Sequence, residues 1–493
     1  MSPLQRTTRA LAPALLLVLA GCAAVGPDYQ KPELAVPDAW HASAVEGLDT
    51  GEANLQAWWA GLGDPDLEEL IRRAEAANLD LRLATARIRE ARARLGLASG
   101  EKRPTVDASG SASRSELSDN SPLGPLAPNG FEATDLYDLG FDASWEIDVF
   151  GRIRRSVESA GAAYEASVED YRDVLVTLLA EVARTYVDVR ALQARISYAT
   201  ANAKAQRETF GLTRARYDAG ATSAIDVAQA ESNLRTTEAA IPALEIALRF
   251  ARNRLAVLLG ERPGALDAEL GDAGGIPEPP PDLVVGVPAE LMRQRPDLRG
   301  AERRLAAQTA RIGVATADLY PRFSLSGFFA AEATDAGDLF DGNSVTWGVS
   351  LPFRWRLFDR GRIRSAIEIE EARTEQALVA YERTLLFALE EVENALTAYA
   401  LERQRRDRLG QAVAASQRTV ELAEIQYRSG LTGFQDVLDS QRFLAQQQDL
   451  FATSEGQMVQ NLIALYKALG GGWDPGAAQS AADGGETEAG SGS

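Results

Sequence analysis

The chain has 493 residues, of which 45% are hydrophobic and 25% charged, and its formal net charge at pH 7 is -20. A chain of this length forms about two to four domains or one elongated architecture. The acidic balance argues against a nucleic-acid partner, because contacts to phosphates require a basic surface. One cysteine and one histidine can form neither an internal disulfide nor a cysteine–histidine metal cluster. The sequence also contains no P-loop, GxGxxG or GxSxG motif, so we expect no enzyme activity, no metal and no cofactor.

Residues 1–21 have the features of a secretory signal peptide. A basic start is followed by an apolar stretch of about ten residues, which is too short to cross a bilayer. The segment ends in Leu-Ala-Gly before Cys22, which matches the bacterial lipobox. We therefore expect a diacylglyceryl group on Cys22, the only covalent addition predicted, although an ordinary signal peptide with a chance cysteine is the alternative. Ala23, rather than aspartate, after the cysteine favours sorting to the outer membrane.

The remainder of the chain consists of two copies of one unit. The sequence WEIDVFGRIR at 145–154 aligns with WRLFDRGRIR at 355–364, and this 210-residue register continues without a gap to the Leu-Gly pairs that end at 260 and 470. Gly- and Pro-rich sequence joins the copies, as in a linker. The expected divisions are a signal peptide at 1–21, a lipidated N-terminal arm at 22–66, a first repeat at 67–264, a linker at 265–287, a second repeat at 288–473 and a disordered tail at 474–493.

Each repeat contains two segments in which apolar and polar residues alternate, the pattern of strands with one apolar face. They begin near residues 104 and 137 in the first repeat and near 321 and 345 in the second. Each has about nine to eleven residues, the length of a tilted membrane strand. A small soluble sheet is the alternative, but its two edges would be exposed. In a membrane the edges must pair, and four strands cannot close a barrel, so the strands would have to be shared among several chains.

Long helices follow the strands in each repeat. Residues 152–217 contain no proline, and their apolar residues alternate at spacings of three and four, as in a coiled coil. The same pattern recurs in the second repeat, and a helix of about 65 residues would be roughly 100 Å long. Gly220 and Gly430 then interrupt helix-favouring sequence at equivalent positions. We expect these glycines to form the turns of two helical hairpins.

Four further helices complete the expected secondary structure. The returning helices of the hairpins are expected at 224–259 and 434–469, and a shorter helix precedes the strands of each repeat at 67–96 and 288–317. A sheet of membrane-length strands that carries long helices is typical of a conduit.

Two segments of the sequence resemble a known family. The segment VPAELMRQRPDLRGAERRLAAQTARIGVATADLYPRFSLSG at 287–327, with GPDYQKP at 26–32, is similar to the TolC-like outer membrane factors. It is most similar to the lipoprotein branch that serves resistance–nodulation–division multidrug efflux systems, and the resemblance covers residues 15–473. The resemblance implies a mainly α-helical protein with membrane β-structure. Three protomers, each with four strands, would share one twelve-stranded outer-membrane β-barrel, continuous with a twelve-helix periplasmic α-barrel.

The resemblance also assigns roles near the hairpin turns. It places adaptor docking at the residues of the two turns, which are Ala219, Gly220, Ala221, Ser429, Gly430 and Leu431. Glycines that only end helices are the alternative. Asp436 and Asp439 match carboxylates that ring the periplasmic aperture of the family, where they would favour cations. Acidic residues near a helix start are also favoured by the helix dipole without any such role.

A closed-state latch is a further implication of the resemblance. Asp226 and Tyr427 match an acceptor and a hydroxyl donor of that latch. The arginine that completes it in well-known relatives is replaced by Thr432, so that ion pair is absent. Arg428 or Arg216 could take its place, and the sequence leaves the choice open.

The expected function is a passive outer-membrane exit duct of a tripartite efflux pump. The implied partners are two further copies of the chain, a periplasmic membrane fusion adaptor protein, a resistance–nodulation–division transporter of the inner membrane and outer membrane lipid. The protein would be lipid-anchored in the outer membrane and extend into the periplasm. An outer-membrane channel of a type I protein secretion system is the first alternative. A lipid-anchored coiled-coil spacer without a pore is the second.

Overall fold

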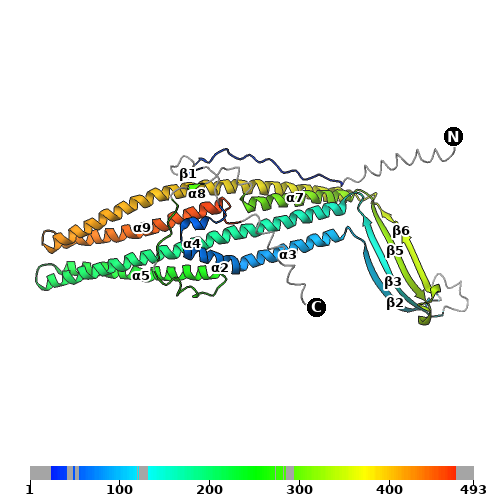
Figure 1. The fold of residues 1–493 in the computed structure, drawn as a ribbon, viewed down its shortest axis with the longest axis horizontal. Coiled ribbons are helices and arrows are strands. Elements are labelled where there is room, and N and C mark those ends of the chain that lie inside the picture. The colour runs from blue at the N-terminus through cyan, green and yellow to red at the C-terminus, as the bar shows by residue number, and fades with distance from the viewer. Residues whose placement is uncertain are drawn as a thin grey trace. The chain divides into compact units, whose positions relative to one another are not determined.

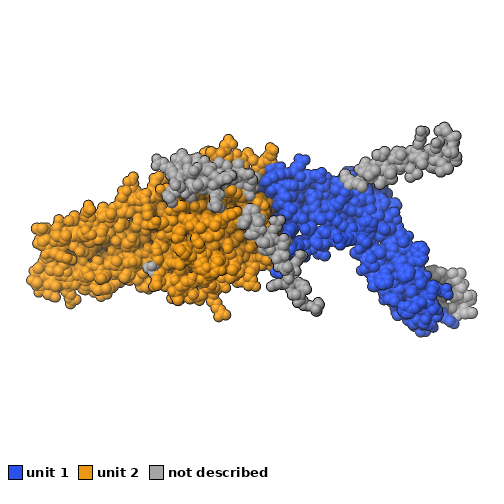
Figure 2. Space-filling model, viewed as in Figure 1, with its two compact units in different colours: residues 1–32, 88–166, 301–381 blue, residues 33–87, 167–300, 382–493 orange. Residues whose placement is uncertain are grey.

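The computed structural model describes residues 24–41, 48–49, 55–118, 120, 132–272, 274–280, 283–284 and 294–473. The expected signal peptide, Cys22 and the tail at 474–493 lie outside these residues. The chain forms two compact units, which Figure 2 shows in different colours. Unit 1 comprises residues 1–32, 88–166 and 301–381, and unit 2 comprises residues 33–87, 167–300 and 382–493. Each unit therefore takes segments from both expected repeats.

Unit 1 contains an antiparallel sheet, whose strands are labelled in Figure 1. Its strands are β2 (Thr105–Ser115), β3 (Thr134–Ile147), β5 (Arg322–Ala333), β6 (Val345–Ser350) and the two-residue β7 (Phe353–Arg354). The order is β2-β3-β5-β6, and β7 pairs with the start of β5. The strands lie where the alternating pattern predicts them, except that the fourth is interrupted. Pro352 has no N–H to donate to the ladder, and its carbonyl accepts a hydrogen bond from Ser324 N at 3.0 Å.

The helices that precede the strands differ between the two repeats. The expected helix at 67–96 is two helices, α2 (Pro65–Ala77) and α3 (Leu79–Gly100), so the expectation of one continuous helix is wrong. Asn78 breaks it with extended backbone at ψ 136°, and its side-chain oxygen accepts hydrogen bonds from Asp80 N and Leu81 N. An asparagine that caps a helix in this way competes with continued helix. In the second repeat α7 (Pro296–Ala317) is a single helix, and residues 288–293 of the expectation lie outside the described part of the chain.

Two helical hairpins contribute most of unit 2. The first is α4 (Arg152–Asp218) with α5 (Ala224–Leu258), and the second is α8 (Arg362–Arg428) with α9 (Phe434–Ala468). Both first helices have 67 residues and both second helices have 35. The bounds predicted for α4, α5 and α9 agree with these helices to within one residue. In Figure 1 each returning helix lies beside its partner. Ion pairs join α5 to α4, and the ring of Phe451 on α9 approaches Gly410 on α8.

The core of unit 2 follows the predicted seam on α8 and a wider surface on α4. On α8 one row of buried residues is spaced by three and four: Leu385, Ala388, Val392, Leu396 and Tyr399. On α4 buried positions lie on more than one face, because the helix also packs against α9. The two helices approach at Gly456, where a Cβ atom would lie 2.8 Å from that of Ala191. The close contact leaves no room for a larger residue at 456.

Short elements complete unit 2. Strands β1 (Leu48–Asp49) and β4 (Leu283–Val284) form a parallel pair. The 3-10 helix η2 (Trp58–Leu62) places Trp58 against Tyr466 of α9, with the rings stacked 5.2 Å apart.

No helix in the described part of the chain is long and apolar enough to cross a membrane. The described residues also hold no group of three His, Cys, Asp or Glu side chains that could bind a metal ion.

Candidate functional site

The two hairpin turns have the same backbone geometry. Gly220 and Gly430 have φ angles of 74° and 78°, a left-handed conformation that side chains disfavour. In the first turn Ala221 N donates to Arg216 O at 2.8 Å and Gly220 N donates to Tyr217 O at 2.8 Å. The second turn repeats this pattern one repeat later. These are the hydrogen bonds of a Schellman motif, which ends a helix and turns the chain.

The residues assigned to adaptor docking all lie at these turns. Ala219, Gly220 and Ala221 are exposed, and so are Ser429, Gly430 and Leu431. Leu431 has an exposed fraction of 80%, and it is the most apolar residue of the two turns. The two turns therefore offer different surfaces, one of small residues and one with a protruding leucine.

A threonine–aspartate pair follows each turn and starts the returning helix. The hydroxyl of Thr222 donates to the carboxylate of Asp226, and the hydroxyl of Thr432 donates to that of Asp436. Asp226 also accepts from Ser223 N at 3.1 Å, and Ser223 Oγ accepts from Asp226 N, which completes a capping box. The Thr222 hydroxyl, together with the Ser223 N–H, holds the pKa of Asp226 below its ordinary value. Asp226 is therefore ionised and committed to the cap of its own helix.

Asp436 and Asp439 lie on the first turns of α9 with exposed side chains. Asp436 pairs with Thr432, whereas both carboxylate oxygens of Asp439 accept from Gln435 Nε2 at 3.0 Å. No cation faces either carboxylate in an ion pair among the described residues. The two aspartates thus present negative charge at the start of α9.

The repeated tyrosine has different surroundings in the two hairpins. Tyr217 has an exposed fraction of 46%, whereas Tyr427 is buried at 3% in a cluster of apolar side chains. The cluster contains Ala230 of the first hairpin and, from the second hairpin, Ala423, Tyr427, Phe434, Val437 and Leu438. The ring of Phe434 meets that of Tyr427 edge-on at 5.8 Å. Tyr427 therefore belongs to the core that holds the two hairpins together near their turns.

Arg216 completes this contact between the hairpins. Its guanidinium donates to the backbone oxygen of Tyr427 at 2.6 Å, and its Cζ lies 4.5 Å from the centre of the Tyr427 ring. Such a charged donor and cation–π contact each stabilise by about 0.5–3 kcal/mol. Arg428 instead pairs with Glu424 on its own helix. Of the two arginines that could replace the missing latch arginine, only Arg216 reaches across to the other hairpin.

The structure does not join Asp226 to Tyr427. Asp226 accepts its hydrogen bonds within the cap of α5, and the buried Tyr427 hydroxyl has no hydrogen-bond partner among the described residues. A buried hydroxyl without a partner costs about 1–3 kcal/mol. The Tyr427 hydroxyl is therefore a buried, unsatisfied donor within the part of the chain that the structure describes.

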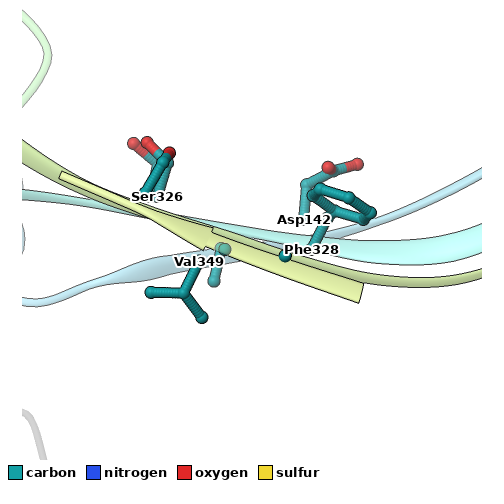
Figure 3. A pocket seen from close by; sticks show the side chains of 9 residues that line it. Asp142, Ser326, Phe328 and Val349 are labelled. Atoms are coloured by element: carbon teal, nitrogen blue, oxygen red, sulfur yellow. The ribbon is translucent and has the colours of Figure 1, made fainter. Parts of the chain in front are cut away.

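The sheet of unit 1 has two chemically different faces. Cross-strand register places Ala108, Phe141, Phe329 and Trp347 in one row, and the rows on either side on the same face are also apolar. These side chains are uncovered: the exposed fraction is 57% for both Phe141 and Phe329 and 72% for Trp347. The opposite face carries mostly serine and acidic residues. In Figure 3 Asp142, Ser326 and Phe328 point to one side of the strands and Val349 points to the other.

The arm that follows Cys22 is held on unit 1 by one buried arginine. Arg155, with 5% of its side chain exposed, donates to the backbone oxygens of Val25 and Gly26 and to the carboxylate of Asp28. A Cβ on Gly26 would lie 2.4 Å from the Cα of Gly313, so the arm lies in direct backbone contact with α7. This close approach explains the glycine that starts the GPDYQKP segment.

Glu302 on α7 fixes the next part of the arm. It accepts a hydrogen bond from Tyr29 Oη at 2.9 Å and forms an ion pair with Lys31 at 3.4 Å. Burial raises the pKa of Glu302, but the hydrogen bonds from Arg303 and Tyr29 outweigh it and lower the pKa below its ordinary value. The GPDYQKP segment thus contacts unit 1 through several of its residues and is not a free linker.

Comparisons with known proteins identify the family. The sequence model of the outer membrane efflux protein family matches residues 70–261 and 287–471. The chain belongs to the outer membrane efflux protein family. Nodulation protein T of Rhizobium leguminosarum bv. trifolii is 32% identical over 471 residues, which are 95% of this chain and 98% of that protein. Outer membrane protein OprJ of Pseudomonas aeruginosa is 32% identical over 468 residues, which are 94% of this chain and 96% of that protein.

Solved structures of outer membrane channels have the same fold. The outer-membrane channel OprN is 37% identical, with a TM-score of 0.87 over 92% of this chain and 100% of that chain. The open state of the MtrE outer membrane channel of Neisseria gonorrhoeae is 27% identical, with a TM-score of 0.78 over 91% of this chain and 98% of that chain. The predicted family, the mainly helical fold and the outer membrane location are confirmed. Because outer membrane efflux proteins are channels, the expectation that the protein is not an enzyme is also confirmed.

Sequence reasoning missed several residues of the hairpin contact. Gln441 on α9 donates to Thr209 on α4 at 2.8 Å, and Arg442 donates to Asn233 on α5 at 3.0 Å. Such polar pairs between helices leave no mark in the hydrophobic periodicity. Phe328 was also missed, although the sequence marks it. It is an aromatic residue on the polar face of β5, where it interrupts the alternation of polar and apolar residues along that strand.

Proposed function

We propose that the protein is the outer-membrane exit duct of a tripartite efflux pump. The apolar face of the unit 1 sheet is the observation that carries this proposal. Uncovered rows of Phe, Trp and Val side chains across four antiparallel strands suit lipid, and the serine-rich opposite face suits a wet lumen. A monomer in water would expose both this apolar face and the two sheet edges, β2 and β6.

The proposed assembly is a homotrimer. Closing both edges within a bilayer requires further strands, and about eight are the minimum for a barrel. Three copies of four strands give twelve, the number that the family resemblance implies. The helical hairpins of three chains would then form the twelve-helix α-barrel that continues the lumen into the periplasm. Its wall would carry no chemistry, and an inner-membrane transporter would supply the energy.

The lipid on Cys22 is proposed as an anchor beside the barrel. The arm is docked on unit 1 as far as Ala24, and Val25 N donates to Phe150 O at 3.0 Å, at the junction between β3 and α4. The two peptide units from Ala24 to Cys22 span at most about 7 Å. An acyl chain on Cys22 would therefore enter the membrane next to the end of the sheet. Acyl chains add an anchor and contribute nothing to conduction.

The hairpin turns are proposed as the adaptor-binding and gating end. Ala219, Gly220, Ala221, Ser429, Gly430 and Leu431 would contact a periplasmic adaptor, with Leu431 as the apolar anchor. Asp436 and Asp439 of three chains would surround the aperture with up to six carboxylates. Asp226 and Tyr427 would take part in the closed-state latch, where the Tyr427 hydroxyl finds a partner in the assembled trimer. A solved relative is described in an open state, which supports a gate in this family.

Names of relatives support small molecules as cargo. They include a pyoverdine export outer membrane protein of Pseudomonas putida and a toluene efflux pump outer membrane protein of the same species. A resistance–nodulation–division transporter and its adaptor are the proposed partners of this chain. We favour this function over protein secretion because these relatives export compounds of low molecular mass.

Cells that lack the gene provide the test. Deletion should raise the intracellular accumulation of exported drugs, and the intact gene should restore efflux. A matched variant with Leu431→Asp should assemble in the outer membrane, as shown by heat-resistant trimers, but should fail to restore efflux because its adaptor surface is changed. Efflux that is unaffected by deletion in a strain without a second such channel would contradict the proposal.

A further inference from the structure

Phe328 departs from the pattern of its strand. On β5 the residues that share its face are Ser324, Ser326, Ala330 and Glu332, whereas the bulky apolar residues lie on the opposite face. The ring is exposed at 45% on this polar face. If a wet lumen were the only requirement, a serine at this position would continue the pattern of Ser324 and Ser326.

A glycine on the neighbouring strand holds the ring in place. Gly348 on β6 is the cross-strand partner of Phe328, and a Cβ at 348 would lie 2.6 Å from the Phe328 Cε1 atom. The ring therefore lies against the backbone of β6, and any other residue at 348 would displace it. Covering a strand glycine with an aromatic ring also stabilises a sheet. Covering Gly348 uses only one face of the Phe328 ring, and the other face is left uncovered.

A carboxylate lies beside the ring. Asp142 on β3 is the direct cross-strand partner of Phe328 on its other side, and Figure 3 shows both side chains on the same side of the sheet. Ser109 Oγ donates to Asp142 at 3.1 Å, and the described residues place no cation on it. The cross-strand partner of Asp142 on β2 is Asp107, a like charge directly opposite, which destabilises a sheet. A cation beside Asp142 and Asp107 would offset the repulsion between the two carboxylates.

The ring and the carboxylate line a shallow hollow of about 390 Å³. Its floor and walls are Asp142, Ser144, Ser326, Phe328, Gly348 and Ser350 on three adjacent strands, together with their flanking backbone. This volume is at the lower end of the range for small-molecule sites, about 300–1,000 Å³. Serine hydroxyls around it can donate to or accept from a ligand without selecting a single geometry.

We propose that this hollow is a contact site for planar aromatic cations that pass through the lumen. An exposed ring attracts a cation over its face, and an adjacent carboxylate adds charge attraction. Both features favour one ligand class, flat organic cations, and disfavour anions of the same shape. The site is open, so binding is weak and fast, which suits transfer along a duct. The inference rests on the proposed function, since it requires that the polar face of the sheet lines the lumen.

Fluorescence anisotropy of ethidium, a planar aromatic cation, tests the site. The full-length trimer is reconstituted into nanodiscs of zwitterionic lipid, so that the membrane itself adds no negative charge. Phe328→Leu and Phe329→Leu are matched variants, because the two residues are adjacent, are both exposed and point to opposite faces of the sheet. Asp142→Asn is matched with Glu332→Gln, a carboxylate of the same face four residues along β5 from Phe328.

We expect saturable ethidium binding that weakens at least fivefold in Phe328→Leu and in Asp142→Asn. Phe329→Leu and Glu332→Gln should change it less than twofold, and fluorescein, a planar anion, should not bind. Equal weakening by Asp142→Asn and Glu332→Gln would overturn the site in favour of a diffuse negative lumen. Equal affinity in Phe328→Leu and the parent would also overturn it. Because the same purified variants are also assayed for conductance in planar bilayers, a failure of channel formation contradicts the proposed function, whereas unchanged binding by variants that conduct contradicts only this site.

Discussion

The guanidinium of Arg216 lies over the ring of Tyr427, 4.5 Å from its centre, and donates a hydrogen bond to its backbone oxygen at 2.6 Å. Arg216 lies in the last turn of α4, the outgoing helix of the first hairpin, and Tyr427 lies in the last turn of α8, that of the second. Arg216 thus joins the two hairpins through both the backbone carbonyl and the ring of Tyr427. A gate that opens by moving one hairpin against the other must break this contact.

Replacing Arg216 should therefore favour the open channel. Arg216→Met keeps much of the side-chain length and removes the charge, and each 1.4 kcal/mol lost from the closed state raises the ratio of open to closed channels about tenfold. Arg216→Lys should have an intermediate effect, because an ammonium cannot donate in a fork and stack at the same time. Single-channel recording measures the open fraction. Arg214→Met, two residues earlier and exposed, is the control and should leave it unchanged. Equal open fractions in Arg216→Met and Arg214→Met would show that the contact between Arg216 and Tyr427 plays no part in the gate.

The Tyr427 hydroxyl provides a separate prediction. Tyr427→Phe keeps the ring for Arg216 and Phe434 but removes the buried donor that has no partner among the described residues. If the hydroxyl is satisfied only in the closed trimer, this variant should open more often, and its thermal stability in detergent should be unchanged or lower, because a hydrogen bond of the closed state is lost. Tyr217→Phe changes the same atom at the exposed, repeated position and should behave like the parent. A more stable Tyr427→Phe trimer with parental gating would show that the hydroxyl is merely unsatisfied.

The aspartates at the start of α9 should differ in their effect on cation block. Asp436 is bonded to Thr432, whereas Asp439 is held only by a Gln435 amide. Asp439→Asn should therefore weaken block by divalent cations added on the periplasmic side more than Asp436→Asn does, and the double variant should weaken it most. The concentration of Mg²⁺ that halves the current is the measurement. Parental block in the double variant would exclude the carboxylates from the aperture.

Adjacent residues on β2 test which face of the sheet meets lipid. Ala108 belongs to the apolar row with Phe141 and Phe329, and Ser109 belongs to the opposite face. A lysine on the lipid face near the middle of a bilayer costs about 2–4 kcal/mol, so Ala108→Lys should reduce the yield of heat-resistant trimers. Ser109→Lys should be tolerated. The reverse result would mean that the faces are assigned the wrong way round.

Docking of the arm should depend on pH through Glu302. The pKa of this carboxyl is lowered from its ordinary value of 4.5. The ionised carboxylate therefore stabilises the folded protein, with the arm in contact, above that pH. The stabilisation is lost as pH falls below about 4.5 and through the lowered pKa, because the protonated group no longer pairs with Lys31. Limited proteolysis at residues 24–31 should accelerate in this range. Glu302→Gln should cleave quickly at neutral pH already, whereas Glu165→Gln, which changes a more exposed partner of Arg303, should not. Cleavage that is independent of pH and of Glu302 would contradict the arm contact.

The sequence predicted the elements with strong periodic patterns. The bounds of α4, α5 and α9 were predicted to within one residue, because the glycines and the long seams mark the same helix ends. The strand faces followed from alternation alone. The break at Asn78 was missed, because asparagine is tolerated in a helix and only its hydrogen bonds to Asp80 and Leu81 reveal a cap.

The contacts between the hairpins could not be read from the sequence in the same way. Tyr217 and Tyr427 have equivalent positions in the repeat, but one is exposed and the other is buried, because the packing against the other hairpin differs. Of Arg216 and Arg428, only the structure indicates which reaches across. The roles of Asp226, Asp436, Asp439 and the docking residues at the turns stay predictions, since they concern partners beyond this chain.

Single-channel conductance of the purified protein in planar bilayers, with its mass determined in the same detergent, tests the central claim most directly. We expect a trimeric species whose openings are small and cation-selective, because the aperture at the hairpin turns is closed at rest and lined with aspartates. A monomer that produces no conductance would contradict the shared barrel and favour a lipid-anchored spacer without a pore.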